Sequence, residues 1–181
     1  MTEIAPPKIA ILSASLKEDS NSRSLCWHAC AFAEERGIEV EFVNLQDHRV
    51  LPYLEEGSEG VEEISTILGG AEGIIVSFPL YNYSMSASLK AVIEHCGKCF
   101  EDKVVGIMTA AGGHNSYMSV MSIAQSLMCD FRSWIVPRYV YAARDSFEER
   151  GKPGAEVCQR VEQLVEVVYR TAWQHKLPLP A

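Results

Sequence analysis

Apolar residues gather in short runs that alternate with stretches of helical spacing. Residues 8–13 (KIAILS), 71–78 and 103–109 are apolar runs bounded by polar residues, which is the pattern of buried strands. Residues 38–45 alternate apolar and polar positions, and residues 134–141 form a further apolar stretch. The pattern therefore predicts five strands, with the second at or near an edge of the sheet.

Between these runs, apolar residues recur every three or four positions, as on one face of an amphipathic helix. The spacing predicts helices over residues 23–36, from about 61 to 68, 86–96, about 117–128 and 157–173. Gly37 ends the first helix in this interpretation, and Ser84 or Ser86 caps the third.

Strands that alternate with amphipathic helices indicate an α/β protein with a parallel sheet covered on both faces. Five such units fit a flavodoxin-like three-layer sandwich with strand order 2-1-3-4-5. The chain has no internal repeat and no low-complexity linker, so residues 1–181 are predicted to form a single domain.

Composition narrows the class of protein. Of the 181 residues, 48% are hydrophobic, which suffices for a well-formed core. The net charge of −8, without any basic block, disfavours nucleic-acid binding. No apolar run approaches the roughly 20 residues of a membrane span, so no membrane insertion is expected. The N-terminus (MTEIAPPKIAIL) is acidic and broken by prolines, unlike a secretion signal, so a cytoplasmic location is predicted.

The cysteines are predicted to be reduced thiols that fill core positions. They are Cys26, Cys30, Cys96, Cys99, Cys129 and Cys158. Cys96 and Cys99 have the spacing of a redox or zinc motif, but Cys96 is at the C-terminal end of a predicted helix, where the dipole raises a thiol pKa. Zinc would need two more ligands, and no second CxxC exists.

Three unusual loops are expected at one edge of the sheet, where strand order reverses between the first and third strands. The first, residues 14–23, opens a helix and contains Lys17 and Arg23. Serines recur through it and just beyond it, at Ser15, Ser20, Ser22 and Ser24. Hydroxyls and N–H groups at a helix N-terminus suit a phosphate. A purely structural capping role for the serines is an equally good explanation. Neither a Walker motif nor GxGxxG occurs.

The other two loops offer surfaces for a flat ring. Pro79 fixes the backbone after the third strand, and Tyr81 and Asn82 follow it; Gly112-Gly113 permit close backbone approach after the fourth. Taken alone, the loop with the tyrosines is better explained as a turn whose rings pack on neighbouring helices, and the glycine loop has the alternative of an ordinary strand-to-helix turn. His114 is a possible proton donor, or a solvated loop histidine. Together the three loops predict a pocket for flavin mononucleotide (FMN).

These segments resemble the NADPH-dependent FMN reductase family. SASLKEDSNSR is similar to its phosphate loop, PLYNYSMSASLKAVIEH to its P-x-Y-N…LK signature and TAAGG to its third loop, and the likeness extends over about residues 8–140. The resemblance implies cofactor contacts at Ser15, Lys17, Ser20, Ser22, Arg23, Pro79, Leu80, Tyr81, Asn82, Thr109, Ala110, Gly112 and Gly113. It also implies a homodimer or homotetramer, in which Tyr83 and Tyr117 face a partner chain.

The sequence departs from the family pattern in the phosphate loop. Ala14 stands in place of the usual glycine, Lys17 of the usual arginine and Ser22 of the usual asparagine. Lysine lacks the bidentate fork of arginine. We therefore expect FMN to bind less tightly than is usual in the family, as a dissociable substrate rather than a fixed prosthetic group.

The resemblance implies an FMN-dependent NAD(P)H oxidoreductase that passes electrons to free flavin, a quinone, an azo compound or a metal oxyanion. FMN and NADPH are its implied cofactors, and no catalytic side chain is expected because the flavin supplies the hydride chemistry. A non-enzymatic electron carrier and a flavin-binding regulatory module are the alternatives. For the 2′-phosphate of NADPH, Lys17, Arg23, Arg138 and Arg144 are candidates that the sequence does not rank.

Overall fold

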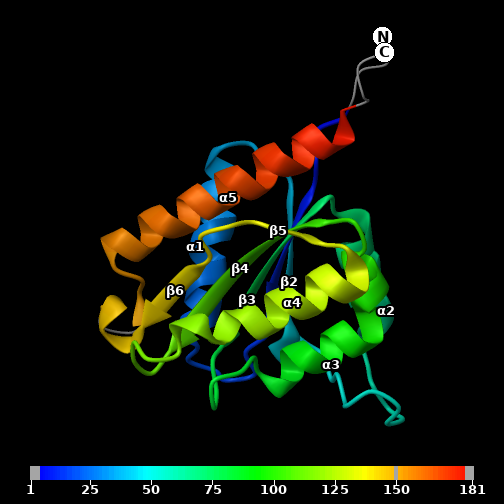
Figure 1. Cartoon of the computed structure of the whole chain (residues 1–181), viewed down its shortest axis with the longest axis horizontal. Helices are drawn as coiled ribbons and strands as arrows, with labels where there is room; N and C mark the ends of the chain where they lie inside the picture. The colour runs from blue at the N-terminus through cyan, green and yellow to red at the C-terminus, as the bar shows by residue number, and fades with distance from the viewer. Residues whose placement is uncertain (1–4, 149–150, 178–181) are drawn as a thin grey trace.

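The computed structural model describes residues 5–148 and 151–177 of the chain (Figure 1). The first four residues, which belong to the acidic N-terminus discussed above, lie outside the described residues, as do positions 149–150 and 178–181.

The sheet has the predicted strand order. Its strands are β1 (Ile9–Ser13), β2 (Val40–Asn44), β3 (Gly73–Pro79), β4 (Val104–Ala111), β5 (Trp134–Ile135) and β6 (Val140–Ala143). They follow the order β2-β1-β3-β4-β5, β6 also pairs with β4, and every pairing is parallel. The flavodoxin-like order 2-1-3-4-5 is therefore confirmed.

The prediction of one continuous fifth strand over residues 134–141 is wrong, because the structure has two strands there. Two short strands, β5 and β6, lie beside β4, with Trp134 opposite Val104 and Val140 opposite Met108. Between them, Pro137 has no N–H to donate to the ladder, and Arg138 has a left-handed backbone (φ 62°). These two residues divide the strand, and β6 continues to Ala143 beyond the predicted end.

Helices cover both faces of the sheet, as Figure 1 shows. They are α1 (Asn21–Glu35), α2 (Val61–Gly70), α3 (Ala87–Cys96), α4 (Val120–Phe131) and α5 (Ala155–Lys176), with short 3-10 helices η1 (Leu45–Asp47), η2 (Gly97–Phe100), η3 (Tyr117–Ser119) and η4 (Arg144–Ser146). Side chains of α1 and α5 form one buried apolar layer, and those of α2, α3 and α4 form the other. This is the three-layer α/β architecture that the pattern predicts.

Helix caps and glycines set the local geometry. Ser86 caps α3, with its Oγ accepting a hydrogen bond from the Leu89 N–H, so the second of the two predicted caps is correct. Helix α5 crosses the sheet above Gly73 and Gly106. A Cβ at Gly106 would lie 2.7 Å from Cγ2 of Val168, and one at Gly73 would lie 2.8 Å from its Cγ1. The two glycines thus allow α5 to approach the sheet closely.

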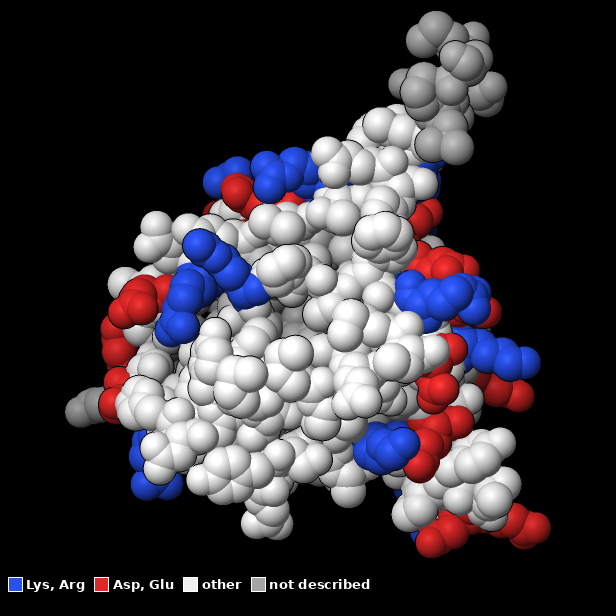
Figure 2. Space-filling view, in the orientation of Figure 1, with Lys and Arg blue, Asp and Glu red and all other residues white. Residues whose placement is uncertain are grey.

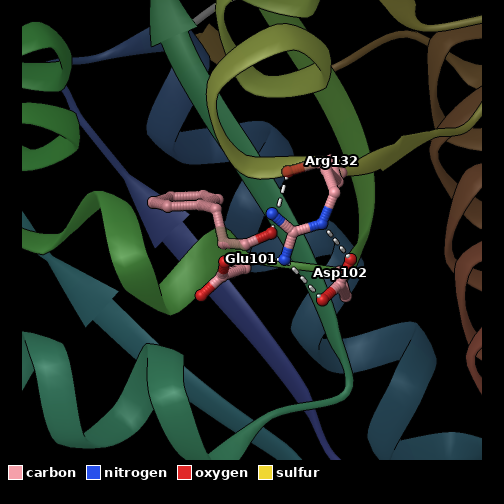
Figure 3. A network of polar contacts seen from close by, with 5 residues as sticks. Glu101, Asp102 and Arg132 are labelled. Carbon is pink, nitrogen blue, oxygen red and sulfur yellow. Dashed lines mark hydrogen bonds and ion pairs between the residues drawn. The ribbon is translucent and has the colours of Figure 1, made fainter.

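Arg132, which follows α4, forms ion pairs with the turn that precedes β4, formed by Glu101 and Asp102 (Figure 3). Arg132 donates to Glu101 Oε1 at 2.6 Å and to both carboxylate oxygens of Asp102, at 3.0 and 2.9 Å. The guanidinium lowers the pKa of Asp102 through these bonds. Because the three side chains are exposed, the network orients the turn more than it stabilises the fold.

The free cysteines differ in how far they are buried. Cys26 and Cys96 are buried, and Cys129 is exposed. Burial raises the pKa of Cys26 to about 12 and also raises that of Cys96, which is the last residue of α3 as predicted. These two thiols are therefore protonated at neutral pH. Within residues 5–148 and 151–177, no three His, Cys, Asp or Glu side chains group as metal ligands, and no helix is long and apolar enough to span a bilayer.

Candidate functional site

A hollow of about 200 Å³ opens at the C-terminal ends of β1, β3 and β4. The three loops predicted from the sequence meet there. Of the predicted site residues, Ser15, Lys17, Ser20, Ser22, Pro79, Leu80, Tyr81, Ala110 and Gly112 line the hollow. The other four predicted residues do not line it. Arg23 and Thr109 are buried, Asn82 lies in the turn after β3, and the Gly113 carbonyl accepts a hydrogen bond from Tyr141.

The loop after β1 presents hydrogen-bond donors at the N-terminus of α1. Ser20 is the N-cap, and its Oγ accepts from the Arg23 N–H at 3.2 Å. The hydroxyls of Ser20 and Ser22 lie 3.0 Å apart, and Ser15 Oγ accepts from the Lys17 N–H. A hydroxyl that already accepts still has its proton to donate. These serines therefore cap the helix and can also bind an anion, so both roles weighed above are compatible.

Arg23 lies behind this loop rather than in the hollow. Its side chain is almost fully buried. The guanidinium donates to the carbonyls of Ser15 and Glu18 at 2.7 and 2.9 Å, and its Nε donates to Asn44 Oδ1 at 2.9 Å. All these acceptors belong to the protein, so Arg23 fixes the shape of the loop and adds positive charge from beneath it.

We expect R23K to weaken FMN binding by about tenfold and to lower the free energy of unfolding by about 1–3 kcal/mol, because lysine cannot satisfy three separated acceptors. Fluorescence titration with FMN and urea unfolding measure the two effects. If Arg23 instead acted as a direct cationic contact to phosphate, lysine would preserve most of the affinity and the stability would hardly change.

The Tyr-Asn-Tyr sequence after β3 forms a tight hairpin turn. The N–H of Tyr81 donates to the carbonyl of Ser84 at 3.0 Å, and the reverse bond is 2.9 Å. Asn82 (φ 50°) and Tyr83 (φ 59°) both have left-handed backbones, as a type I′ turn requires. Asparagine tolerates this conformation. Asn82 therefore lies at the tip of the turn, while Tyr81, 55% exposed, borders the hollow.

The glycine loop after β4 is held from outside. The hydroxyl of Tyr141 donates to the carbonyl of Gly113, and that of Tyr139 donates to the carbonyl of Tyr117. A Cβ at Gly112 would meet no protein atom within 4 Å, so packing within the chain does not require glycine there. A ligand lying against this backbone would require it. Thr109 is buried, with its hydroxyl directed at the Val140 carbonyl at 3.4 Å.

Four residues that the sequence reasoning missed also line the hollow: Asp19, Asn21, Ala111 and Arg144. Asp19 and Asn21 lie inside the predicted phosphate loop, so residues 14–23 as a whole indicate the lining of the hollow better than the individual residues chosen from the family motif. Arg144 directly follows β6, and from the sequence it is only a candidate contact for the 2′-phosphate of NADPH. His114 pairs with Asp145 at 2.9 Å, which lowers the pKa of Asp145 and joins the glycine loop to η4.

Comparison with known families decides what kind of protein has this site. The family model for NADPH-dependent FMN reductases matches residues 7–148, a range that contains all three loops. The chain belongs to the NADPH-dependent FMN reductase family. FMN and a nicotinamide nucleotide are therefore its cofactors, and it is a member of a family of FMN-dependent NAD(P)H oxidoreductases.

Individual relatives of this FMN reductase family member are distant. The chain is 24% identical over 149 residues to the NAD(P)H-dependent FAD/FMN reductase of Geobacillus thermodenitrificans, covering 77% of this chain and 78% of that protein. It is 28% identical over 127 residues to the probable NADPH:quinone oxidoreductase 2 of Oryza sativa, covering 65% of this chain and 63% of that protein. The structure of FerB, a flavoenzyme NAD(P)H:(acceptor) oxidoreductase from Paracoccus denitrificans, has a TM-score of 0.73 at 16% identity, covering 93% of this chain and 98% of that one.

Proposed function

We propose that this chain oxidises NAD(P)H through FMN and reduces a small acceptor such as free flavin, a quinone or an azo compound. The observation that carries the proposal is the convergence of a serine-rich helix N-terminus, a tyrosine hairpin and a glycine loop on one hollow. The rice relative named as a probable quinone oxidoreductase supports the inclusion of quinones among the acceptors.

The residues present fit FMN. In the proposed arrangement the phosphate lies against Ser15, Ser20 and Ser22 at the N-terminus of α1, with Lys17 supplying positive charge. The ring lies along two backbone segments, residues 79–81 and 110–112. Arg23, Asn82, Thr109 and Gly113 then act indirectly, by shaping the loops in which they lie.

Bound FMN supplies the hydride chemistry, and the protein supplies position and electrostatics. N–H groups of the glycine loop would stabilise negative charge that develops on the pyrimidine edge of the ring. Tyr141 and Tyr139 hold that loop from outside, so the donors need little rearrangement. No side chain in the hollow is required as an acid or base, and we propose none as catalytic.

FMN is proposed to exchange readily. Besides Lys17 in place of arginine, Asp19 adds a carboxylate to the lining of the hollow, close to the proposed phosphate position. A carboxylate near a dianionic phosphate lowers its affinity. This supports a role for FMN as a dissociable substrate.

An absorbance spectrum and a turnover assay test the proposed function together. The protein loaded with FMN is expected to lose its flavin absorbance when NADPH is added without oxygen, and to oxidise NADPH continuously when free FMN or a quinone is supplied. Absence of turnover with both NADPH and NADH would leave the electron carrier, for which the acidic charge of the chain is suitable. Turnover only with an added protein partner would favour the regulatory module.

A second copy of the chain is the proposed partner. Helix α4 and the segment before it expose Tyr117, Met118, Met121 and Met128, and Figure 2 shows that the face they lie on is largely uncharged. Contiguous exposed apolar side chains mark interaction surfaces. We propose that this face forms a homodimer or homotetramer interface in which Tyr83 and Tyr117 approach the partner. The single domain and the cytoplasmic location remain predictions.

We expect M121D to convert the assembly to a monomer, because a carboxylate cannot be buried there without a partner. Sedimentation velocity of the wild type and the variant measures this change. The matched control is S122D on the same helix, one residue away and also exposed, which adds the same charge without removing an apolar side chain. A wild-type protein that sediments as a monomer at micromolar concentration would contradict the proposed interface.

A further inference from the structure

A second hollow lies at the edge of the sheet, between α5 and the segment that joins β5 to β6. This groove has a volume of about 480 Å³. Its lining combines three arginines and two tyrosines with an apolar floor: Arg138, Arg160, Arg170, Tyr117, Tyr139, Val136, Leu164 and Val167. Figure 2 shows basic side chains gathered where this segment passes α5.

The positive charge of the groove is largely uncompensated, although the chain as a whole is acidic. In the described part of the chain, neither Arg138 nor Arg170 forms an ion pair, whereas Lys8, Lys90, Arg132 and Lys176 each do. The acid that lines the groove, Glu166, is paired at 3.0 Å with Arg36.

Arg160 adds to the same imbalance. Its Nη1 donates to the Tyr141 carbonyl at 3.1 Å, and among the described residues its buried Nε has no hydrogen-bond partner. Its ion pair with Glu156 is long, with 3.9 Å between Nε and Oε1. Three arginines facing one hollow with so little neutralisation favour an anionic ligand.

The backbone at Arg138 is a second sign of a site. Arg138 has φ 62°, a left-handed conformation that is uncommon for a long side chain, and it follows Pro137 in the segment that interrupts the sheet. Backbone strain of this kind tends to occur at binding sites. Here both Pro137 and Arg138 line the groove.

The tyrosines provide a flat surface next to the arginines. The rings of Tyr117 and Tyr139 are 4.9 Å apart with an interplanar angle of 33°. Burial raises the pKa of Tyr139, so its hydroxyl stays protonated and donates to the Tyr117 carbonyl. A neutral ring pair beside guanidinium groups suits an aromatic base that carries a phosphate.

The groove adjoins a further hollow that reaches the glycine loop. An adjacent hollow of about 580 Å³ shares Tyr117 and Arg160 with it, and is also lined by His114 and by the first turn of α5. His114 belongs to the loop whose other end, at Gly112, lines the flavin hollow. A ligand that spans the two hollows would reach from the glycine loop to the arginines. It would pass the start of α5, where free N–H groups favour an anion, and also Asp145 and Glu156.

We propose that this groove binds the adenosine 2′-phosphate end of NADPH and thereby selects NADPH over NADH. The inference rests on the proposed function, in which a nicotinamide nucleotide meets FMN at the hollow. It also ranks the basic residues that the sequence left open. Arg23 is committed to its loop, Lys17 and Arg144 line the flavin hollow, and Arg138 lines the groove.

Calorimetric titration of the FMN-loaded protein tests the groove without turnover. The probes are 2′,5′-ADP, which has the 2′-phosphate, and 5′-AMP, which lacks it. We expect 2′,5′-ADP to bind at least about tenfold more tightly than 5′-AMP, a difference equal to one charge-assisted contact. R138Q and R170Q are each expected to remove about tenfold of the affinity for 2′,5′-ADP and to leave FMN affinity unchanged.

The matched control is R49Q, which removes an exposed arginine beyond β2, at the opposite edge of the sheet. It is expected to leave both titrations unchanged. In steady-state assays, R138Q and R170Q should raise the KM for NADPH about tenfold and leave the KM for NADH and both kcat values near those of the wild type.

Equal affinity for the two probes, or losses in R138Q and R170Q no larger than in R49Q, would overturn the assignment even if the enzyme oxidises NADPH. Selective 2′,5′-ADP binding that depends on Arg138 and Arg170 would support it even if no acceptor is reduced, and that result would contradict only the proposed reductase function.

Discussion

K17E is expected to weaken FMN binding by about 100-fold. Lys17 lines the flavin hollow beside the serine hydroxyls, and no carboxylate in the described residues forms an ion pair with it. The substitution removes a cation near the proposed dianionic phosphate and places an anion there, so attraction changes to repulsion. Fluorescence titration of the protein with FMN at low ionic strength measures the loss, which should become smaller as salt is added.

K98E is the matched control for this charge reversal. Lys98 is exposed in η2, which precedes β4 and therefore lies at the end of the sheet opposite the hollow. The same change of net charge at that distance should alter FMN affinity by less than about twofold. Similar losses in K17E and K98E would mean that net charge, and not a phosphate site at the first loop, governs binding.

The second large effect is expected on stability. G106A should lower the free energy of unfolding by about 1–3 kcal/mol, because the new methyl group would lie 2.7 Å from Cγ2 of Val168 and 3.3 Å from two carbons of Leu164. Helix α5 would have to move away from the sheet or adopt strained rotamers. Urea unfolding measures the change.

Two comparisons make this prediction specific. G70A adds the same methyl group where nothing lies within 4 Å, at the end of α2, so its stability should be equal to the wild type or up to about 1 kcal/mol higher. V168A in the G106A background should cost less than V168A alone, since it removes the clash. Additive losses in the double variant would show that Gly106 and Val168 are not in contact.

Much of the architecture could be predicted because each strand and helix has its own periodicity. The apolar runs that became β1, β3 and β4 and the amphipathic stretches that became α1 and α5 are local signals, and alternation of the two types determines a parallel sheet. The division of the fifth strand was also present locally, in Pro137, but the apolar residues around it concealed the interruption.

The candidate site was predictable to the level of its loops but not of its individual side chains. That the loops after β1, β3 and β4 meet follows from strand order alone. The directions of side chains within them do not. Arg23 and Lys17 are both basic residues of one loop, yet only the three-dimensional positions of the Ser15 and Glu18 carbonyls turn Arg23 inward.

The sequence by itself determined the order of the strands, the three loops at the edge of the sheet and the family to which the chain belongs, because these depend on local periodicity and short motifs. The tertiary structure alone decided which residues line the hollow, why Gly106 must be glycine and that Arg138, Arg160 and Arg170 line one groove. Those features depend on contacts between segments far apart in the chain, such as α5 and the β5–β6 segment, whose distances no local pattern encodes.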